Sequence, residues 1–513
     1  MWRKNLLFII AVVLVSQFLV HLPDYLRWKN TPSDLWFTGQ VSWFDPWDLN
    51  VYFGAVGWGE RAGLLFQNLY DGHASAPLYI FTVYTLLGKL LGSFDLSNAA
   101  IFHIGTVFLN FVLAPILWWF IKIFLEKDVE RKIAFFLIYF GGGLGWLFFP
   151  NMVLPDLGQP GFIFESATRR PHEAVSVSFI LLSLGGLWIG TVYRKSKYFV
   201  LSAISLLGAF YLHPYTVLPL SLIVSIFGLY QWLKNKDKSF WKAVLTIGIS
   251  GFVYLVLFGR HLIGESSFAG LQGQVQFSAN PLYAVLGWGI LFPFIVTIII
   301  TPTSRKEISF MKFWFVIQFV SMYLPLGFQK LLGRGLWIDA VMLGVIGVGL
   351  FVKKVNLQYK FLLILTIALA SISPLFIFAK KISEPAGNRW IYITSDEKKV
   401  IDYLDINGKN EELVLASYRL SNIIPANTKK RVYAGHEYQT PDFKSRITQV
   451  NKFYSGGMND QEAKDFLNGL NTTWVFWGPD EKVIGGISKI PNLELLEPVI
   501  EEKEASLYKI KKL

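Results

Sequence analysis

The segment DPWDLNVYF, residues 45–53, lies in a long acidic stretch between the first two apolar runs of the chain. That stretch, residues 23–97, carries seven acidic and four basic residues, whereas the other short polar segments are mostly basic. Membrane proteins keep Lys and Arg in their cytoplasmic loops, so an acidic loop is expected on the outer face of the membrane. We therefore expect residues 23–97 to form an outer loop whose carboxylates take part in chemistry.

The composition is that of a multi-pass membrane protein. The 513 residues are 53% hydrophobic and 16% aromatic, and many apolar runs approach the length of about 20 residues that a spanning helix needs. The net charge is +12, but residues 380–513 hold 20 basic and 19 acidic residues, so the excess lies in the apolar part. This distribution indicates membrane topology rather than nucleic-acid binding. Because the chain has no cysteine, disulfides, thiolate metal ligands and a catalytic thiol are excluded.

The number of membrane crossings and the charges of the loops together predict the topology. A further apolar run at residues 77–91 would span only about 22 Å as a helix, against an apolar bilayer core of about 30 Å. If it does not cross, the basic segments KDVERK, YRKSK, KNKDK, TSRKE and KKVNLQYK all lie with residues 1–4 in the cytoplasm, as the positive-inside rule requires. We therefore expect residues 77–91 to form a juxtamembrane or re-entrant helix. The eleven predicted spans are residues 5–22, 98–121, 133–150, 172–193, 198–212, 214–232, 242–259, 281–301, 309–327, 336–352 and 361–379.

The same count of crossings places five segments on the outer side of the membrane. They are residues 151–171, 213–215, 260–280 and 329–335, and the C-terminal part. Residues 1–379 are expected to form a membrane domain, with an uncleaved first helix, and residues 380–513 an extracytoplasmic α/β domain. Helical patterns such as DEKKVIDYL and DQEAKDFLNGL alternate there with strand-like apolar runs. Those runs are residues 413–417, 431–435, 473–478 and 505–510. The predicted fold is thus a polytopic α-helical membrane protein with eleven spans and a C-terminal α/β domain.

Asp48 and Asp45 are the candidate catalytic residues. The segment after them, residues 49–66, has the apolar spacing of a helix that lies on the membrane surface. A hydroxyl acceptor needs a base to lose its proton during attack, and apolar surroundings raise the proton affinity of a carboxylate toward that role. The alternative for Asp48 is a structural role as a helix N-cap.

Outer cations are candidate ligands of a phosphate group. The segment ESATRRPHE, residues 165–173, gathers cations at the start of an outer helix, where guanidinium and backbone N–H groups match phosphate oxygens. Further cations follow in the turn YLHPY and in FQKLLGRG. Interfacial snorkelling, helix capping or a structural histidine is the alternative explanation for each. The candidates are Arg169, Arg170, His172, His213, Lys330 and Arg334.

The C-terminal part shows no recognised catalytic motif. AGHEYQTPDF places His436, Glu437 and Asp442 in a loop after a predicted strand, which is a common position for binding residues. The HExxH zinc pattern, the GxSxG elbow and the Walker loop are absent from the sequence.

The layout resembles the GT-C superfamily of membrane glycosyltransferases, particularly the protein O-mannosyltransferase and lipid A aminoarabinose transferase types. DPWDLNVYF and APLYIFTVYTLLGKLLG stand where that family has its first-loop aspartate and a short helix opened by prolines. The resemblance implies that Asp48 is the base, with Asp45 as its neighbour and substitute. The C-terminal part is similar to the outer domain of many uncharacterised bacterial proteins of this layout. The shared residues there are Gly435, His436, Thr440, Pro441 and Asp442.

This resemblance implies a cell-envelope glycosyltransferase. The donor would be a polyprenyl-phosphate sugar, with its phosphate beside the outer cations, and the acceptor a lipid, glycan or protein on the outer face. Ala76-Pro77-Leu78 stands where the family has two prolines, and the WWDYG signature of the oligosaccharyltransferase branch is missing. The DPW start is similar to the metal-binding start of that branch, so a divalent metal stays open, although no cofactor is required. The alternatives are a lipid or solute transporter, for which Asp339 is the notable carboxylate within a span, and a non-catalytic scaffold.

Overall fold

The computed structural model describes residues 2–42, 45–158, 161–263, 275–355, 358–385, 387–470, 472–486 and 489–511. The chain divides into two compact units, and each is described by itself. The first unit comprises Met1–His21, Gly105–Arg260 and Val275–Ile382, and the second comprises mainly Leu22–Ile104 and Ser383–Leu513. Part of the outer loop predicted at residues 260–280 lies outside the described residues.

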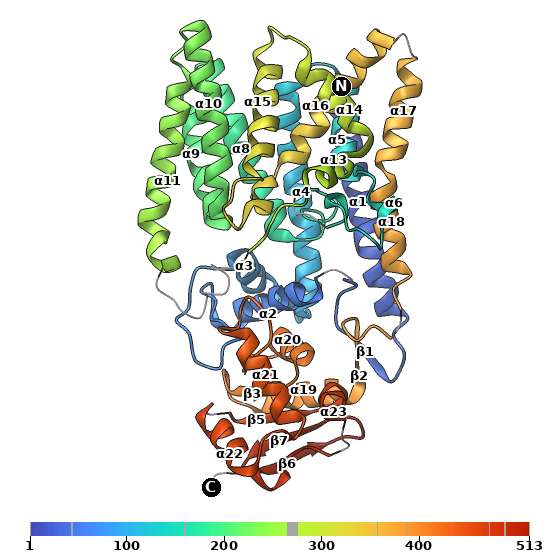
Figure 1. Ribbon diagram of the computed structural model, residues 1–513, viewed down its shortest axis with the longest axis vertical. Coiled ribbons are helices and arrows are strands. Elements are labelled where there is room, and N and C mark those ends of the chain that lie inside the picture. The colour runs from blue at the N-terminus through green and yellow to red at the C-terminus, as the bar shows by residue number, and fades with distance from the viewer. Residues whose placement is uncertain are drawn as a thin grey trace. The chain divides into compact units, whose positions relative to one another are not determined.

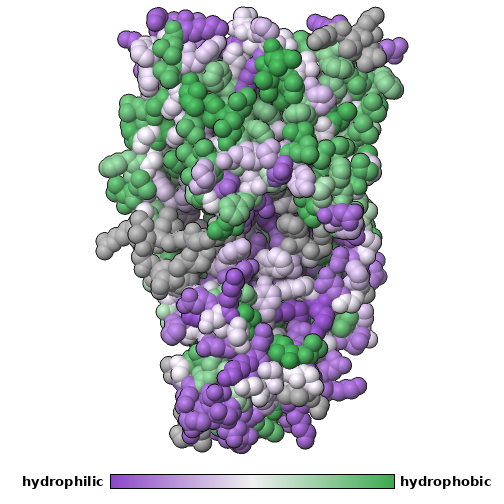
Figure 2. Space-filling model, viewed as in Figure 1, coloured by the Kyte–Doolittle hydropathy of each residue, from purple (hydrophilic) through white to green (hydrophobic). Residues whose placement is uncertain are grey.

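Apolar helices make up the first unit (Figure 1). Within the described residues, eight helices or helical runs are long and apolar enough to cross a membrane. The surface of this unit is largely hydrophobic in the view of Figure 2, as expected for helices that face lipid. The eight are α1 (Trp2–Lys29), α4 (Asn98–Phe124), α8 (Pro171–Val192), α10 (Val217–Asn235), α11 (Phe240–Ile263), α13 with α14 (Pro281–Trp288 and Phe292–Ile300), α16 (Leu336–Val355), and α17 with α18 (Tyr359–Ala370 and Ile372–Ile382).

All eleven predicted spans overlap helices, although the predicted span 133–150 extends beyond the end of its helix at Phe140. The polytopic helical class is confirmed. Three of them coincide with shorter helices, which have 13, 16 and 16 residues. A helix of 16 residues reaches only about 24 Å, so the count of eleven crossings stays a prediction. These shorter helices are α5 (Asp128–Phe140), α9 (Lys197–Leu212) and α15 (Lys306–Ser321).

The second unit contains the predicted C-terminal α/β fold (Figure 1). Its sheet has the strand order β4-β3-β5-β7-β6, in which β3 runs parallel to β4 and β5, while β7 runs antiparallel to β5 and β6. The four strand-like runs of the sequence correspond to β3 (Leu413–Leu415), β4 (Arg431–Val432), β5 (Trp474–Trp477) and β7 (Ser506–Ile510). The edge strand β6 (Leu496–Glu501) was not predicted, because half of its residues are exposed and one of them is Pro498.

Among the described residues of the C-terminal part, five α-helices accompany the sheet. The two predicted helical patterns correspond to α19 and α22, and each of these helices begins with a capping box. A short antiparallel pair, β1 (Leu35–Phe37) with β2 (Tyr392–Thr394), ties the first loop to the segment before α19. The helices are α19 (Ser395–Asn407), α20 (Tyr418–Asn427), α21 (Phe443–Tyr454), α22 (Asp460–Gly469) and α23 (Pro479–Gly485).

The first loop, residues 23–97, and the C-terminal part share one hydrophobic core. Helix α2 (Pro46–Ala62) buries Leu49 and Val56 in the same cluster as Ile423 and Ile424 of α20. At Gly54 the two helices approach so closely that a Cβ atom would lie 3.2 Å from the backbone oxygen of Pro425. Burial of apolar surface of this kind is the main stabilising contribution to folding, so the position of α2 is fixed by the C-terminal part.

The apolar run at residues 77–91 forms the short helix α3 (Thr82–Leu91), which packs across α2 in the second unit. The crossing depends on two glycines. A Cβ atom at Gly59 would lie 2.0 Å from the carbonyl oxygen of Thr85, and one at Gly88 would lie 1.9 Å from that of Val56. No side chain fits at either distance, so both positions require glycine.

We expect Gly88→Ala to destabilise the second unit by about 1–3 kcal/mol, because the added methyl group forces α2 and α3 apart. The matched control is Gly251→Ala in α11, where a Cβ atom would meet nothing within 4 Å. The thermal unfolding midpoint of the detergent-purified chain, followed by tryptophan fluorescence, measures both variants. Equal midpoints for the two variants would contradict the close crossing.

Candidate active site

Asp48 forms a hydrogen bond with a histidine of the C-terminal part. It lies in the first turn of α2, and its carboxylate accepts from His436 Nε2 at 2.8 Å. The side chain of His436 is 3% exposed, whereas that of Asp48 is 34% exposed. The Nδ1 atom of His436 accepts the backbone N–H of Tyr438 at 3.1 Å, so in the neutral ring the proton is on Nε2. His436 is therefore a buried donor to a partly exposed carboxylate.

A tight turn after β4 brings His436 to this position. The Thr440 hydroxyl accepts the backbone N–H of Gly435 at 3.1 Å and donates to the carbonyl of Tyr70 at 3.0 Å. Gly435 packs so closely that a Cβ atom would lie 2.7 Å from the Tyr70 ring and 2.9 Å from the carbonyl oxygen of Ser421. The Gly-His and Thr-Pro-Asp residues noted in the sequence thus form the turn that positions the histidine.

Two phenols share the electrostatic environment of Asp48. Burial, and then the negative charge of Asp48, raise the pKa of Tyr70. Burial, followed by Glu437 and Asp48, raises the pKa of Tyr418 to about 12. Both hydroxyls therefore stay protonated at neutral pH, and that of Tyr70 is buried without a hydrogen-bond partner among the described residues. The region around Asp48 thus offers neutral O–H donors in addition to the histidine.

Asp45 has a different environment. It is the N-cap residue of α2, it is 5% exposed, and its carboxylate accepts a hydrogen bond from the Ser42 hydroxyl at 2.6 Å. The structural alternative that made Asp48 the N-cap is wrong, because Asp48 lies within the helix. A catalytic role for Asp45 stays a prediction, and of the two carboxylates Asp48 is the more accessible.

In the first unit, a buried carboxylate gathers three of the predicted cations. Arg334 donates to Glu173 from Nε at 2.9 Å and from Nη2 at 2.6 Å, and the two side chains are 6% and 1% exposed. The Nε2 atom of His172 lies 3.6 Å from Glu173, and that of His213 lies 3.9 Å from it. A bare carboxylate at this depth would be costly, so Arg334 acts as its counter-ion.

His213 carries a buried N–H donor next to this ion pair. Arg334 donates to the Tyr215 hydroxyl, and that hydroxyl lies 2.8 Å from His213 Nδ1. When Tyr215 donates in this contact, the proton of the neutral ring is on Nε2. Burial, and then the positive charge of Arg334, lower the pKa of His213, so the ring is neutral. Within the described part of the chain, Nε2 has no hydrogen-bond partner. Such a donor is suited to a ligand oxygen.

Three predicted cations remain, and one of them interacts electrostatically with Glu173. Arg169 pairs with Glu165 at 2.9 Å, and Lys381 contacts the same carboxylate at 3.0 Å. Arg170 precedes α8, and burial, opposed by the charge of Glu173, lowers the pKa of its guanidinium. Lys330 lies in the 3₁₀ helix η5 (Gln329–Gly333). Phosphate-binding roles for these cations stay predictions.

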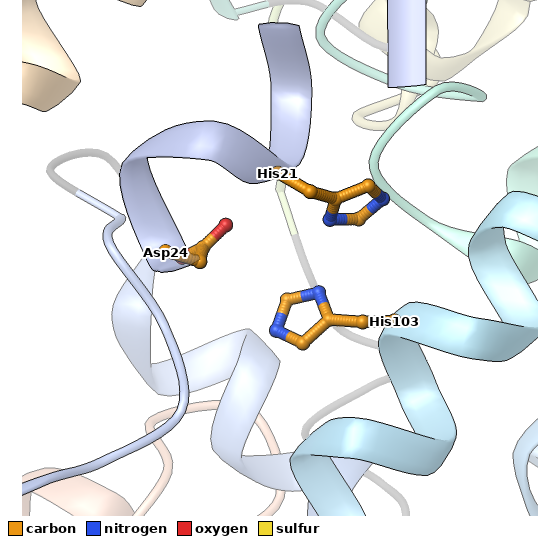
Figure 3. A group of neighbouring side chains, drawn as sticks. All are labelled: His21, Asp24 and His103. Atoms are coloured by element: carbon orange, nitrogen blue, oxygen red, sulfur yellow. The ribbon is translucent and has the colours of Figure 1, made fainter. Parts of the chain in front are cut away.

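Two groups of side chains have the composition of a metal site. His172, Glu173 and His213 form the first, but Arg334 already occupies both oxygens of Glu173. Asp24 and His103 belong to the second, with His21 one helical turn before Asp24 on α1 (Figure 3). His103 Nε2 contacts the carbonyl oxygen of Gly39 at 2.8 Å, an arrangement that directs Nδ1 to the ligand position. The second group therefore fits a divalent ion better.

The local sequence pattern points only weakly to three residues of these clusters, namely His436, Glu173 and Tyr215. His436 was visible only as a polar residue in a loop, and Glu173 only as an acidic residue at a helix start. Tyr215 was part of the turn YLHPY, yet its hydroxyl joins Arg334 to His213. A Gly-His pair followed by Thr-Pro was the one signal for His436.

Comparison with known proteins identifies the fold. No protein-family model and no curated protein sequence matches the chain. Among solved structures, the oligosaccharyltransferase AglB of Archaeoglobus fulgidus, with an inhibitory peptide and dolichol-phosphate, is 12% identical with a TM-score of 0.53, covering 93% of this chain and 70% of that one. An oligosaccharyltransferase of the same organism, in complex with zinc and sulfate, is 11% identical with a TM-score of 0.56, and the match covers 98% of this chain and 73% of that one.

The arabinofuranosyltransferase AftD from mycobacteria is 9% identical to this chain, with a TM-score of 0.56. The match covers 98% of this chain but only 40% of AftD. The chain thus has the fold of the GT-C membrane glycosyltransferases, and it is a multi-pass membrane protein. The resemblance stated from the sequence is confirmed at the level of the fold.

We expect Arg334→Met to cost about 3–5 kcal/mol of stability, because it leaves the Glu173 carboxylate buried without its counter-ion. The double variant Arg334→Met/Glu173→Gln removes that charge and should recover part of the loss. Thermal unfolding midpoints of the purified variants measure the difference. A double variant that is less stable than Arg334→Met alone would contradict the assignment of this pair.

Proposed function

We propose that the protein transfers a sugar from a polyprenyl-phosphate donor to a hydroxyl acceptor on the outer face of the membrane. The observation that carries the proposal is the partly exposed Asp48 carboxylate, held by His436, in a chain with the GT-C fold. AglB was solved with dolichol-phosphate, which is a lipid phosphate of the proposed class. The proposed topology has a cytoplasmic N-terminus and an extracytoplasmic C-terminal part.

In this mechanism Asp48 is the general base. The acceptor oxygen attacks the anomeric carbon while its proton passes to the Asp48 carboxylate. The bond between the anomeric carbon and the phosphate oxygen breaks, and its electron pair leaves with the polyprenyl phosphate. Attack opposite the leaving group inverts the anomeric configuration. Asp45, which is buried and bonded to Ser42, would substitute only if α2 rearranged.

The cluster around Glu173 is proposed to bind the phosphate of the donor. Its Nε2–H donor on His213 is buried and lacks a partner among the described residues, and such a donor favours an anionic ligand. Arg334 and Arg170 add positive charge, which a single carboxylate does not offset. Such groups stabilise the negative charge that develops on the leaving phosphate. In this assignment Arg169 and Lys330 lie outside the primary phosphate contacts.

A divalent ion is compatible with the proposal but is not required by it. Asp24 and His103, with His21 on the same helix as Asp24, would hold it through one carboxylate oxygen and ring nitrogens. Nitrogen and oxygen ligands of this kind suit zinc or another first-row metal. When bound, such an ion would supply a fixed positive charge and a Lewis acid.

We expect Asp48→Asn to lower the transfer rate by about 10²–10⁴-fold, because the amide cannot accept the proton. The purified chain would be incubated with a panel of polyprenyl-phosphate sugars, and release of free polyprenyl phosphate would be measured. Asp34→Asn, which alters an exposed carboxylate of the same loop, is the matched control and should keep full activity.

Full turnover by the Asp48→Asn variant would remove this residue from the role of base. The same assay separates the transporter alternative from the transferase. A transporter moves its substrate unchanged, whereas the transferase consumes the donor and releases the lipid phosphate. A scaffold without activity would do neither with any donor of the panel.

We expect His213→Asn to raise the KM for the donor about tenfold or more, because a hydrogen bond to a charged group contributes about 1.5–3 kcal/mol. Asparagine keeps an acceptor for the Tyr215 hydroxyl but lacks the Nε2–H donor. Arg194→Gln, an exposed cation in the segment YRKSK, is the control and should leave KM unchanged. An unchanged KM in His213→Asn would rule out this histidine as a phosphate ligand.

A further inference from the structure

We propose that His436, supplied by the C-terminal part, is the positioning residue that aims the Asp48 carboxylate in glycosyl transfer. This inference rests on the proposed function and adds a residue from a segment that carries no catalytic motif. The juxtaposition joins residues 388 positions apart in the sequence. His436 does not contact the substrate in this assignment and acts through Asp48.

The orientation of the histidine is fixed from its other side. The Tyr438 backbone N–H occupies Nδ1, so the ring is held as a donor from Nε2. A donor in one fixed direction selects one rotamer of the carboxylate. Among the described residues His436 is the hydrogen-bond partner of the Asp48 side chain, and it engages one of the two oxygens. The second oxygen remains for the acceptor hydroxyl, consistent with the partial exposure of Asp48.

The contact is not needed to join the first loop to the C-terminal part, because other interactions within the second unit do so. Asp71 of the loop forms an ion pair with Arg446 at 2.8 Å. Arg431 donates to the carbonyl oxygens of Asp71 and Gly72 at 3.2 and 3.0 Å. The shared core of α2 and α20 adds apolar burial. Because these contacts already hold the first loop against the C-terminal part, the hydrogen bond between His436 and Asp48 is not required for that structural role.

The surroundings of the pair are suited to positioning rather than to charge neutralisation. The nearby titratable groups are the protonated phenols of Tyr70 and Tyr418 and the carboxylate of Glu437. A neutral N–H donor to a carboxylate is a strong and directional contact, because charge-assisted hydrogen bonds are short. The 2.8 Å separation lies in that range. The histidine thus fixes the direction of the base without adding a full counter-charge.

The test compares two substitutions at one position. His436→Leu removes the donor and should lower kcat about tenfold or more while KM changes by less than about twofold, because the contact acts on the reacting geometry and not on substrate binding. His436→Gln keeps an N–H donor near the position of Nε2 and should recover most of kcat. Loss of activity in both variants to the same extent, or in neither, would overturn the proposal.

Arg446→Leu is the matched control for a structural role, since it removes another link between the first loop and the C-terminal part. If His436 only joined the two segments, Arg446→Leu would reduce kcat to a similar degree. We expect its kcat to stay near that of the wild type. A wild-type chain that transfers no sugar would defeat the proposed function itself, whereas an active wild type with a fully active His436→Leu would defeat only the inference.

A second measurement does not depend on activity. In ¹⁵N-histidine-labelled full-length protein, the NMR signals of His436, assigned by their absence in His436→Gln, should show protonated Nε2 and unprotonated Nδ1. Asp48→Asn should shift the Nε2 signal more than the Nδ1 signal. The opposite tautomer in the wild type would contradict donation from His436 to Asp48.

Discussion

The burial of helix α2 in the core of the C-terminal part is the constraint on which the candidate active site depends. A helix with the apolar surface of α2 has two ways to remove that surface from water, namely the membrane interface or another protein surface. Here Leu49 and Val56 enter the same cluster as Ile423 and Ile424, and Gly54 permits close backbone approach. Asp48 lies in the first turn of that helix, so its direction is set by the packing. The turn that carries His436 is anchored on Tyr70 of the same loop.

A second constraint acts on the charges of the first unit. Ionised groups in apolar surroundings are stable only when they are paired. Glu173 is paired with Arg334, and Glu165 is paired with Arg169 and Lys381. Two of the cations that the sequence predicted as phosphate ligands, Arg334 and Arg169, are therefore already paired with carboxylates. What remains available for an anion is the net positive charge of the Glu173 cluster and the Nε2 atom of His213, which has no hydrogen-bond partner among the described residues.

The sequence predicted those features whose cause is local. Hydropathy and charge predicted the long apolar helices of the described residues, and apolar runs of strand length predicted β3, β4, β5 and β7. Edge strand β6 was not predicted, because apolar and polar residues alternate only weakly along it and it contains Pro498. The local pattern does not determine the number of membrane crossings either. Helices of 13 and 16 residues are shorter than the apolar core of a bilayer, so their length alone does not show that they cross it.

Pairings between distant residues could not be predicted from one sequence. The acidic loop and the DPW pattern singled out Asp48, but His436 follows 388 residues later, and nothing near Asp48 specifies it. In the same way, Arg334 and Glu173 are separated by 161 residues. Their association follows from tertiary packing. An unpaired buried carboxylate costs folding free energy, so a residue distant in the sequence is brought next to it as a counter-ion. A local pattern identifies the group that needs a partner, whereas the fold determines which residue becomes that partner.

The choice of a neutral histidine as the partner of Asp48 has a chemical reason. A Lys or Arg in contact with a carboxylate favours its ionised form strongly and therefore weakens it as a base. A neutral N–H donor orients the carboxylate without bringing a full positive charge to the group that must accept the proton. The described residues include no ion pair between Asp48 and a Lys or Arg side chain, in contrast to Glu173 and Glu165. The paired carboxylates of the first unit are thus suited to structure, and the histidine-bound carboxylate of the second unit is suited to proton transfer.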